Sequence, residues 1–127
     1  ARAVVENSKK AVVVVDMPYG SYENSKTKAL ENAKKILELS GADAVKLEGG
    51  EKIVDVIKHL KKNKVNVMGH LGMLPQQMNG NYKIYGRSTI EKKQLMRDVK
   101  SLEDSGVFAI VIECTGHLFQ HFSIAAE

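Results

Sequence analysis

Short apolar runs recur four times along the chain, and each ends in an ionisable residue. The runs are VVVVD, DAVKLE, VNVMGH and AIVIE, which close at Asp16, Glu48, His70 and Glu113. Strands that are apolar on both faces are typical of a buried parallel sheet. We therefore predict strands over about 11–16, 43–47, 65–68 and 108–112.

The stretches between these runs have helical periodicity. Apolar residues recur at intervals of three and four over about 25–39, 52–62 and 89–104, which predicts three amphipathic helices. For the first of these helices, Asn24 or Ser25 is the expected cap and Gly41 the expected end. For the last, we expect Thr89 to cap the start and Gly106 to close the end.

Three further segments complete the chain. The first ten residues have the character of the end of a helix, and HLFQHFSIAAE predicts a helix after the last strand. The polar insert over about 77–87 follows an Asn-Gly turn and alternates in character, which favours a short hairpin over the strand ends.

Strands that alternate with helices predict an α/β fold with parallel strands. The right-handed crossover rule leaves two architectures, an open doubly wound sheet or part of a (β/α)8 TIM barrel. A complete barrel needs about 250 residues, and this chain of 127 residues has about four βα units. We expect one domain over 1–127, the central part of a larger barrel truncated at both ends.

Composition narrows the class of protein. The chain is 43% hydrophobic and 27% charged, which is ordinary for a soluble globular domain, and it has no run long enough to span a membrane. Its net charge of +4 comes from lysines scattered along helices without interleaved aromatics, so we expect no nucleic-acid partner. The single cysteine, Cys114, fits a reducing cytoplasm, and we expect it to be a small buried residue.

Five polar residues fall at the carboxyl ends of the predicted strands: Asp16, Lys46, Glu48, His70 and Glu113. Enzymes with parallel sheets place their chemistry at this edge. Because side chains alternate along a strand, all five can face one pocket. Burying unpaired charges is costly, so their convergence favours a shared ligand or ion.

The chemistry of each residue indicates a role. Asp16 and Glu48 are hard oxygen ligands that suit Mg²⁺, although either can instead form a salt bridge with Lys46. Lys46 can hold a substrate carboxylate as a point charge. Glu113, at the end of an otherwise apolar strand, suits a general base.

His70 has two interpretations. It is either a substrate-pocket residue or a core histidine bonded to a backbone carbonyl. The glycines beside it, Gly69 and Gly72, favour the first, because they mark a place where something approaches the backbone closely. Together, a divalent ion, a lysine anchor and a carboxylate base form a site for enolising a 2-oxo acid, whose enolate then attacks an electrophile.

Four ordered motifs carry a resemblance to a known family. DMPYGSY, AVKLEGGE, VMGHLGMLPQ and VIEC, together with NYKIYGR, closely resemble the ketopantoate hydroxymethyltransferase family over nearly the whole chain. The resemblance implies a (β/α)8 barrel that transfers a hydroxymethyl group from 5,10-methylenetetrahydrofolate to 3-methyl-2-oxobutanoate, giving 2-dehydropantoate in pantothenate biosynthesis. It also implies a cytoplasmic, Mg²⁺-dependent enzyme that forms a homo-oligomer at full length.

The same resemblance implies residue roles. Asp16 would bind Mg²⁺ and lie against the substrate, Lys46 would bind the substrate carboxylate, and Glu48 would bind the metal. Glu113 would be the proton acceptor, and His70 would line the substrate pocket. These roles agree with those inferred from the strand faces.

The chain also departs from the family pattern. It has no match to the G-D-S motif, which supplies another Mg²⁺ ligand, or to the G-I-G-A-G strand. Leu74 stands in place of the usual threonine, Asn81 in place of a glycine, and Cys114-Thr115-Gly116 in place of Cys-Val-Pro. By this mapping the chain holds strands three to six of eight, and we expect the 127 residues alone to be inactive.

Two alternatives remain open. One is a metal-dependent lyase or aldolase of the same barrel group that acts on another 2-oxo acid. The other is an inactive half-barrel that needs a partner to cover its open sheet edges.

Overall fold

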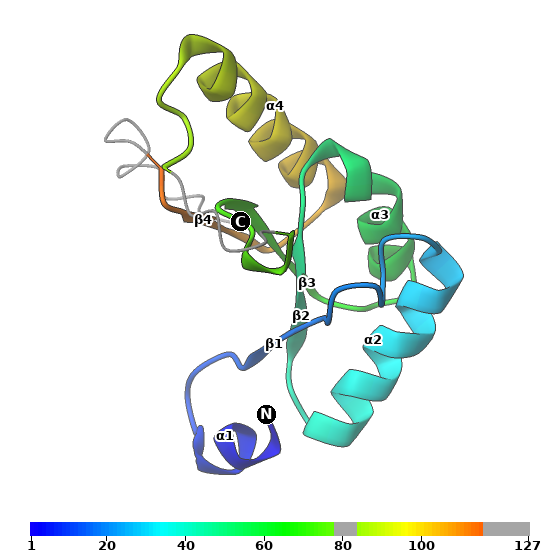
Figure 1. Ribbon diagram of the computed structural model, residues 1–127. Coiled ribbons are helices and arrows are strands. Elements are labelled where there is room, and N and C mark those ends of the chain that lie inside the picture. Colours follow the sequence, from blue (N-terminus) through cyan, green and yellow to red (C-terminus); the bar gives the residue numbers. More distant parts are fainter. Residues whose placement is uncertain (78–83, 116–127) are drawn as a thin grey trace.

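The chain folds as one parallel sheet with helices between its strands (Figure 1). The structure, a computed structural model, describes residues 1–77 and 84–115. The strands are β1 (Val14–Asp16), β2 (Ala44–Glu48), β3 (Val67–Gly72) and β4 (Ala109–Glu113). The helical elements are α1 (Arg2–Asn7), α2 (Lys26–Ser40), η1 (Glu51–Ile53), α3 (Val54–Lys62), η2 (Pro75–Gln77) and α4 (Thr89–Ser105).

The strand order is the same as the order along the chain, β1-β2-β3-β4, and every neighbouring pair is parallel. Helices α2, α3 and α4 lie side by side along one face of this sheet (Figure 1). A doubly wound sheet changes its strand order and carries helices on both faces. Sequential strands with helices on one face are instead the arrangement of a (β/α)8 barrel, which confirms the prediction of a partial barrel.

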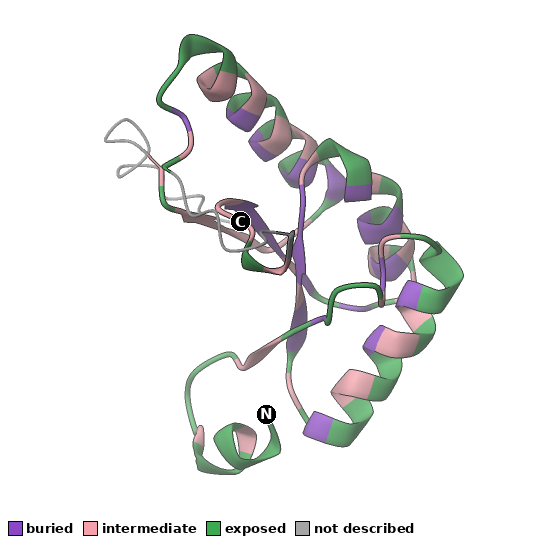
Figure 2. Cartoon of the chain, viewed as in Figure 1, coloured by how far each residue is buried: buried purple, intermediate pink, exposed green. Residues whose placement is uncertain are grey.

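The hydrophobic core fills the space between the sheet and these three helices. Val45 and Leu47 of β2 meet Ile57 and Leu60 of α3 and Leu102 of α4, and all five are completely buried. In Figure 2 the buried residues of α2, α3 and α4 face the sheet and their exposed residues face outward. The core therefore holds the helix-facing side chains of the strands and leaves the alternate side chains, Lys46 and Glu48 among them, for the opposite face.

Helix ends follow the sequence with one exception. Ser25 caps α2 by accepting the backbone N–H of Lys28, and Gly41 ends α2 with a φ of 72°. The cap of α4 is Ser88, whereas the sequence predicted Thr89. The Ser88 hydroxyl accepts the backbone N–H of Glu91, whose carboxylate returns to Ser88, and this capping box starts the helix one residue earlier.

Other expectations are corrected or fall outside the described residues. β3 runs further than predicted, so His70 lies inside the strand, whereas β1 is shorter than predicted. Cys114 is exposed, which contradicts the expected burial, because it follows the last residue of β4. Most of the hairpin expected at 77–87 and the whole helix expected near the C-terminus lie outside the described residues. No helix in the described ranges has the length and apolar character needed to cross a membrane.

Candidate active site

The parallel register brings all five candidate residues to one edge of the sheet. Asp16 pairs with Lys46 between β1 and β2, and Glu48 pairs with His70 between β2 and β3. Glu113 pairs with Gly72, the last residue of β3. The carboxyl ends of four adjacent strands therefore carry these groups next to one another, as the sequence predicts.

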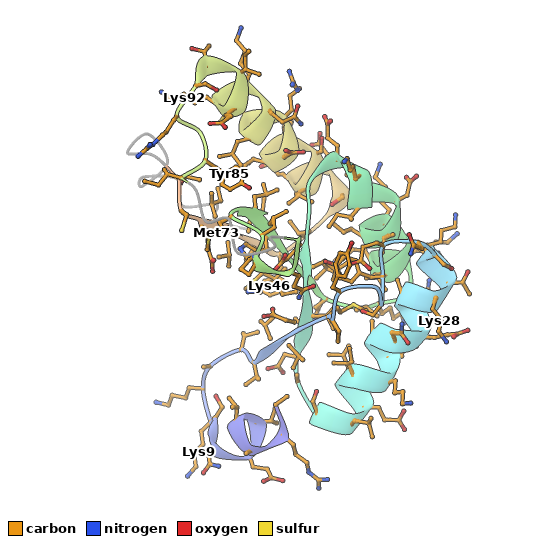
Figure 3. The ribbon with its side chains drawn as sticks, in the orientation of Figure 1. Lys9, Lys28, Lys46, Met73, Tyr85 and Lys92 are labelled. Atoms are coloured by element: carbon orange, nitrogen blue, oxygen red, sulfur yellow. The ribbon has the colours of Figure 1, made fainter. Side chains whose placement is uncertain are left out.

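Asp16 and Lys46 form an ion pair across the first two strands. The Lys46 Nζ lies 3.3 Å from the Asp16 Oδ1, so the salt bridge that the sequence left open as an alternative is present. The Asp16 side chain is 58% exposed, whereas that of Lys46 is 20% exposed. In Figure 3 Lys46 lies against the sheet, while Lys9, Lys28 and Lys92 project from the outer parts of the molecule.

His70 lies between two carboxylates. It is 2% exposed, with its Nδ1 3.6 Å from the Glu48 Oε1 and its Nε2 3.6 Å from the Glu113 Oε2. Neither ring nitrogen forms a hydrogen bond within the part of the chain that is described. The alternative of a core histidine bonded to a backbone carbonyl is therefore wrong, and the ring lies between the acids that end β2 and β4.

Glu48 is the most constrained of the acids. Its residue is 6% exposed, and its Oε2 accepts the backbone N–H of Gln76 at 3.2 Å. Burial raises the pKa of Glu48, opposed by that N–H and by His70, while the charge of Asp16 raises it further. The two acids that the sequence assigned to a metal are thus close enough to repel each other.

Two residues that sequence reasoning missed hold this acid in place. The Tyr22 hydroxyl accepts the backbone N–H of Glu48 at 3.0 Å and donates to the Glu48 carbonyl at 3.2 Å. The Gln76 side-chain amide donates to the carbonyl of Met17 at 3.0 Å, which ties the loop after β3 to the loop after β1. Both residues belong to the motifs DMPYGSY and VMGHLGMLPQ, but no spacing rule links a loop tyrosine to a strand 26 residues away.

The glycines beside His70 make room for the protein itself. A Cβ at Gly69 would lie 2.7 Å from the Leu102 Cδ1, and one at Gly72 would lie 2.1 Å from the Glu113 carbonyl oxygen. The prediction of a close approach at these positions is confirmed. What approaches is helix α4 and strand β4.

Of the five side chains, that of Glu48 lines a cavity at this edge. That cavity, about 650 Å³, is lined by Glu48 together with loop and helix residues such as Gly50, Ile53, Leu74 and Asp98. Asp16, Lys46, His70 and Glu113 are not among its lining residues. A single pocket shared by all five residues stays a prediction, and the described residues show the five groups next to one another at the strand ends.

Asp16 and Glu48 fit Mg²⁺ as a partial ligand set. Mg²⁺ takes one or two protein carboxylates and keeps several waters, and the repulsion between these acids is what a cation would relieve. Among residues 1–77 and 84–115, no group of three or more metal-ligating side chains occurs. Two carboxylates would be the contribution of the described residues to such a site, with the remaining ligands supplied from elsewhere.

Sequential parallel strands, helices on one face and charged groups at the carboxyl ends of the strands define a protein of the (β/α)-barrel class. The sequence pattern described as ketopantoate hydroxymethyltransferase matches residues 1–121. The chain belongs to the ketopantoate hydroxymethyltransferase family.

Individual relatives agree with this assignment. The chain is 53% identical over 114 residues to a 3-methyl-2-oxobutanoate hydroxymethyltransferase of Pelagibacter ubique, a match that covers 90% of this chain and 44% of that protein. It is 48% identical over 116 residues to the enzyme of that name in Rhizobium etli and 46% identical over 115 residues to that in Bacteroides thetaiotaomicron, each covered to 42%. The chain thus spans less than half the length of these relatives.

Proposed function

We propose that this chain is the central part of a 3-methyl-2-oxobutanoate hydroxymethyltransferase. The whole enzyme would move a one-carbon unit from 5,10-methylenetetrahydrofolate to 3-methyl-2-oxobutanoate and form 2-dehydropantoate. The names of the relatives support the substrate. The row of charges at the strand ends supports the type of chemistry, which is removal of a proton beside a keto group.

Each residue has a role in this proposal. Lys46 binds the substrate carboxylate, Asp16 and Glu48 bind Mg²⁺, and His70 lines the pocket. Glu113 takes the proton from C3, the carbon next to the keto group, and that carbon then attacks the one-carbon unit. Mg²⁺, when bound, would polarise the keto oxygen and lower the cost of the negative charge that develops there.

The observation that carries the proposal is the contact of His70 with both acids. The ring reaches Glu48 on one side and Glu113 on the other, at 3.6 Å each. A metal ligand and a base held on opposite sides of one buried ring can act on the two neighbouring carbons of a single 2-oxo acid. The Glu113 side chain is 41% exposed, so this base is accessible to a substrate.

A hybrid enzyme tests the proposal. The segment of this chain that matches the Pelagibacter ubique relative over 114 residues replaces the corresponding segment of that protein, which supplies the remaining parts of the fold. We expect the hybrid to form 2-dehydropantoate from 3-methyl-2-oxobutanoate in a manner that requires 5,10-methylenetetrahydrofolate and Mg²⁺.

Pyruvate in place of 3-methyl-2-oxobutanoate is the matched control, because it differs only in the carbon skeleton beside the keto group. A folded hybrid that leaves 3-methyl-2-oxobutanoate unchanged contradicts the proposal. Preference for pyruvate would favour the lyase or aldolase alternative.

A further inference from the structure

The backbone of Glu48 faces a gap in the sheet. The backbone N–H and carbonyl groups of even-numbered residues of β2 point toward β1, as the Met17 N–H shows by donating to the Lys46 carbonyl. Those of odd-numbered residues point toward β3, and the Gly49 N–H that follows the strand accordingly donates to the His70 carbonyl. By this alternation the N–H and carbonyl of Glu48 point toward β1. β1, however, ends at Asp16.

Tyr22 fills this gap with its hydroxyl group. Its hydroxyl oxygen takes the place of a strand carbonyl for the Glu48 N–H, and its proton takes the place of a strand N–H for the Glu48 carbonyl. Tyr22 is 1% exposed, so water does not compete for these bonds. The carbonyl of Met17, which a longer β1 would have offered, is already used by the Gln76 side chain.

We infer that Tyr22 is a positioning residue whose hydroxyl fixes the peptide of Glu48 and thereby aims the Glu48 carboxylate. The inference rests on the proposed function, which gives that carboxylate to the metal. Fixing both the N–H and the carbonyl of one residue sets the direction of its Cα–Cβ bond. Without the hydroxyl, two buried backbone groups lose their partners and the end of β2 is free to rotate.

The test uses two phenylalanine variants in the hybrid enzyme. Tyr22→Phe deletes the positioning hydroxyl, and Tyr19→Phe deletes the same atom from a tyrosine of the same loop that is 66% exposed. Circular dichroism first establishes that both variants are folded. Mn²⁺ then replaces Mg²⁺ as the probe, and its dissociation constant is measured by electron paramagnetic resonance without substrate.

We expect Tyr22→Phe to weaken Mn²⁺ binding about tenfold and Tyr19→Phe to leave it within about twofold of the parent. If the parent binds Mn²⁺ and Tyr22→Phe binds it equally well, the inference is wrong and the proposed function stands. If the parent hybrid does not bind Mn²⁺, the metal assignment of the proposed function fails, and the inference fails with it.

Amide exchange gives a second, independent reading. In the 127-residue chain we expect the Glu48 amide to exchange at least about tenfold faster in Tyr22→Phe than in the parent or in Tyr19→Phe. An unchanged rate overturns the inference. Should Tyr22→Phe not fold, the fallback variant carries 4-aminophenylalanine at position 22, whose amino group keeps a donor and an acceptor. Mn²⁺ affinity within about threefold of the parent supports the inference. A loss of tenfold or more overturns it.

Discussion

The two acids that contact His70 lie in very different surroundings. Glu48, at the end of an interior strand, is buried, its backbone is held by Tyr22 and its carboxylate by Gln76. Glu113 ends β4, the last strand of the described sheet, and its side chain is 41% exposed. Two residues with the same carboxylate chemistry thus differ in setting: Glu48 is held in place and buried, whereas Glu113 is accessible.

The difference suits two different tasks. A metal ligand that is already fixed binds the ion more tightly, because less side-chain conformational entropy is lost when the ion binds. A base that takes a proton from a substrate must remain reachable. The raised pKa of Glu48 is the cost of the first arrangement, since its ionised form is penalised by burial while the cation is absent.

Blocking the close approach of β4 to Gly72 should have the largest effect on stability. A Cβ in Gly72→Ala would meet the Glu113 carbonyl oxygen at 2.1 Å at a φ of 86°, and we expect the chain to lose about 3 kcal/mol or more of unfolding free energy. Gly20→Ala is the control, with a similar φ of 82° and no neighbour within 4 Å, and it should cost about 1 kcal/mol. Urea denaturation measures both, and equal losses would show that the contact with β4 does not matter.

Deleting the support of Glu48 should have the next largest effect. At neutral pH we expect Tyr22→Phe to lower the free energy of unfolding by about 1–3 kcal/mol, because two buried backbone groups lose their partner.

The same variant has a distinct dependence on pH. Burial raises the pKa of Tyr22 to about 12, so the unfolded chain ionises first, and the stability that this residue contributes is complete below pH 10 and lost as the pH rises toward 12. The difference in unfolding free energy between the parent and Tyr22→Phe should therefore shrink over that interval. A difference that stays constant up to pH 12 would contradict the burial of this hydroxyl.

Neutralising Glu48 or Glu113 should change the free energy of unfolding by a smaller amount than the substitutions above. In metal-free buffer at pH 7 we expect Glu48→Gln to stabilise the chain by about 0.5–2 kcal/mol, because it removes a buried charge, and Glu113→Gln to change stability by less than about 0.5 kcal/mol. A carboxyl group with a raised folded pKa destabilises most when ionised, so the gain from Glu48→Gln should vanish as the pH falls through the ordinary range of Glu. Calorimetry of both variants at pH 7 and pH 4 tests this, and a stabilising effect of Glu113→Gln equal to that of Glu48→Gln would contradict the comparison.

The sequence predicts much of this arrangement because the responsible rules are local. Period-two alternation and the parallel register are enough to bring Asp16, Lys46, Glu48 and His70 to one edge. The contact between Tyr22 and Glu48 depends instead on where β1 stops and how its loop folds back, which no local pattern encodes.

The glycines show the same limit. Their small size signals a close approach, but the sequence does not name the approaching group, which proves to be Leu102 for Gly69 and Glu113 for Gly72.

Proton exchange at C3 of 3-methyl-2-oxobutanoate tests the central claim most directly, because it isolates the step assigned to Glu113 from folate binding. In the hybrid enzyme with Mg²⁺ in D₂O, nuclear magnetic resonance should show exchange without 5,10-methylenetetrahydrofolate, and Glu113→Gln should slow it by about 10²–10⁴-fold with the fold intact. Exchange at the parent rate in the folded Glu113→Gln variant would contradict the assignment of Glu113 as the base.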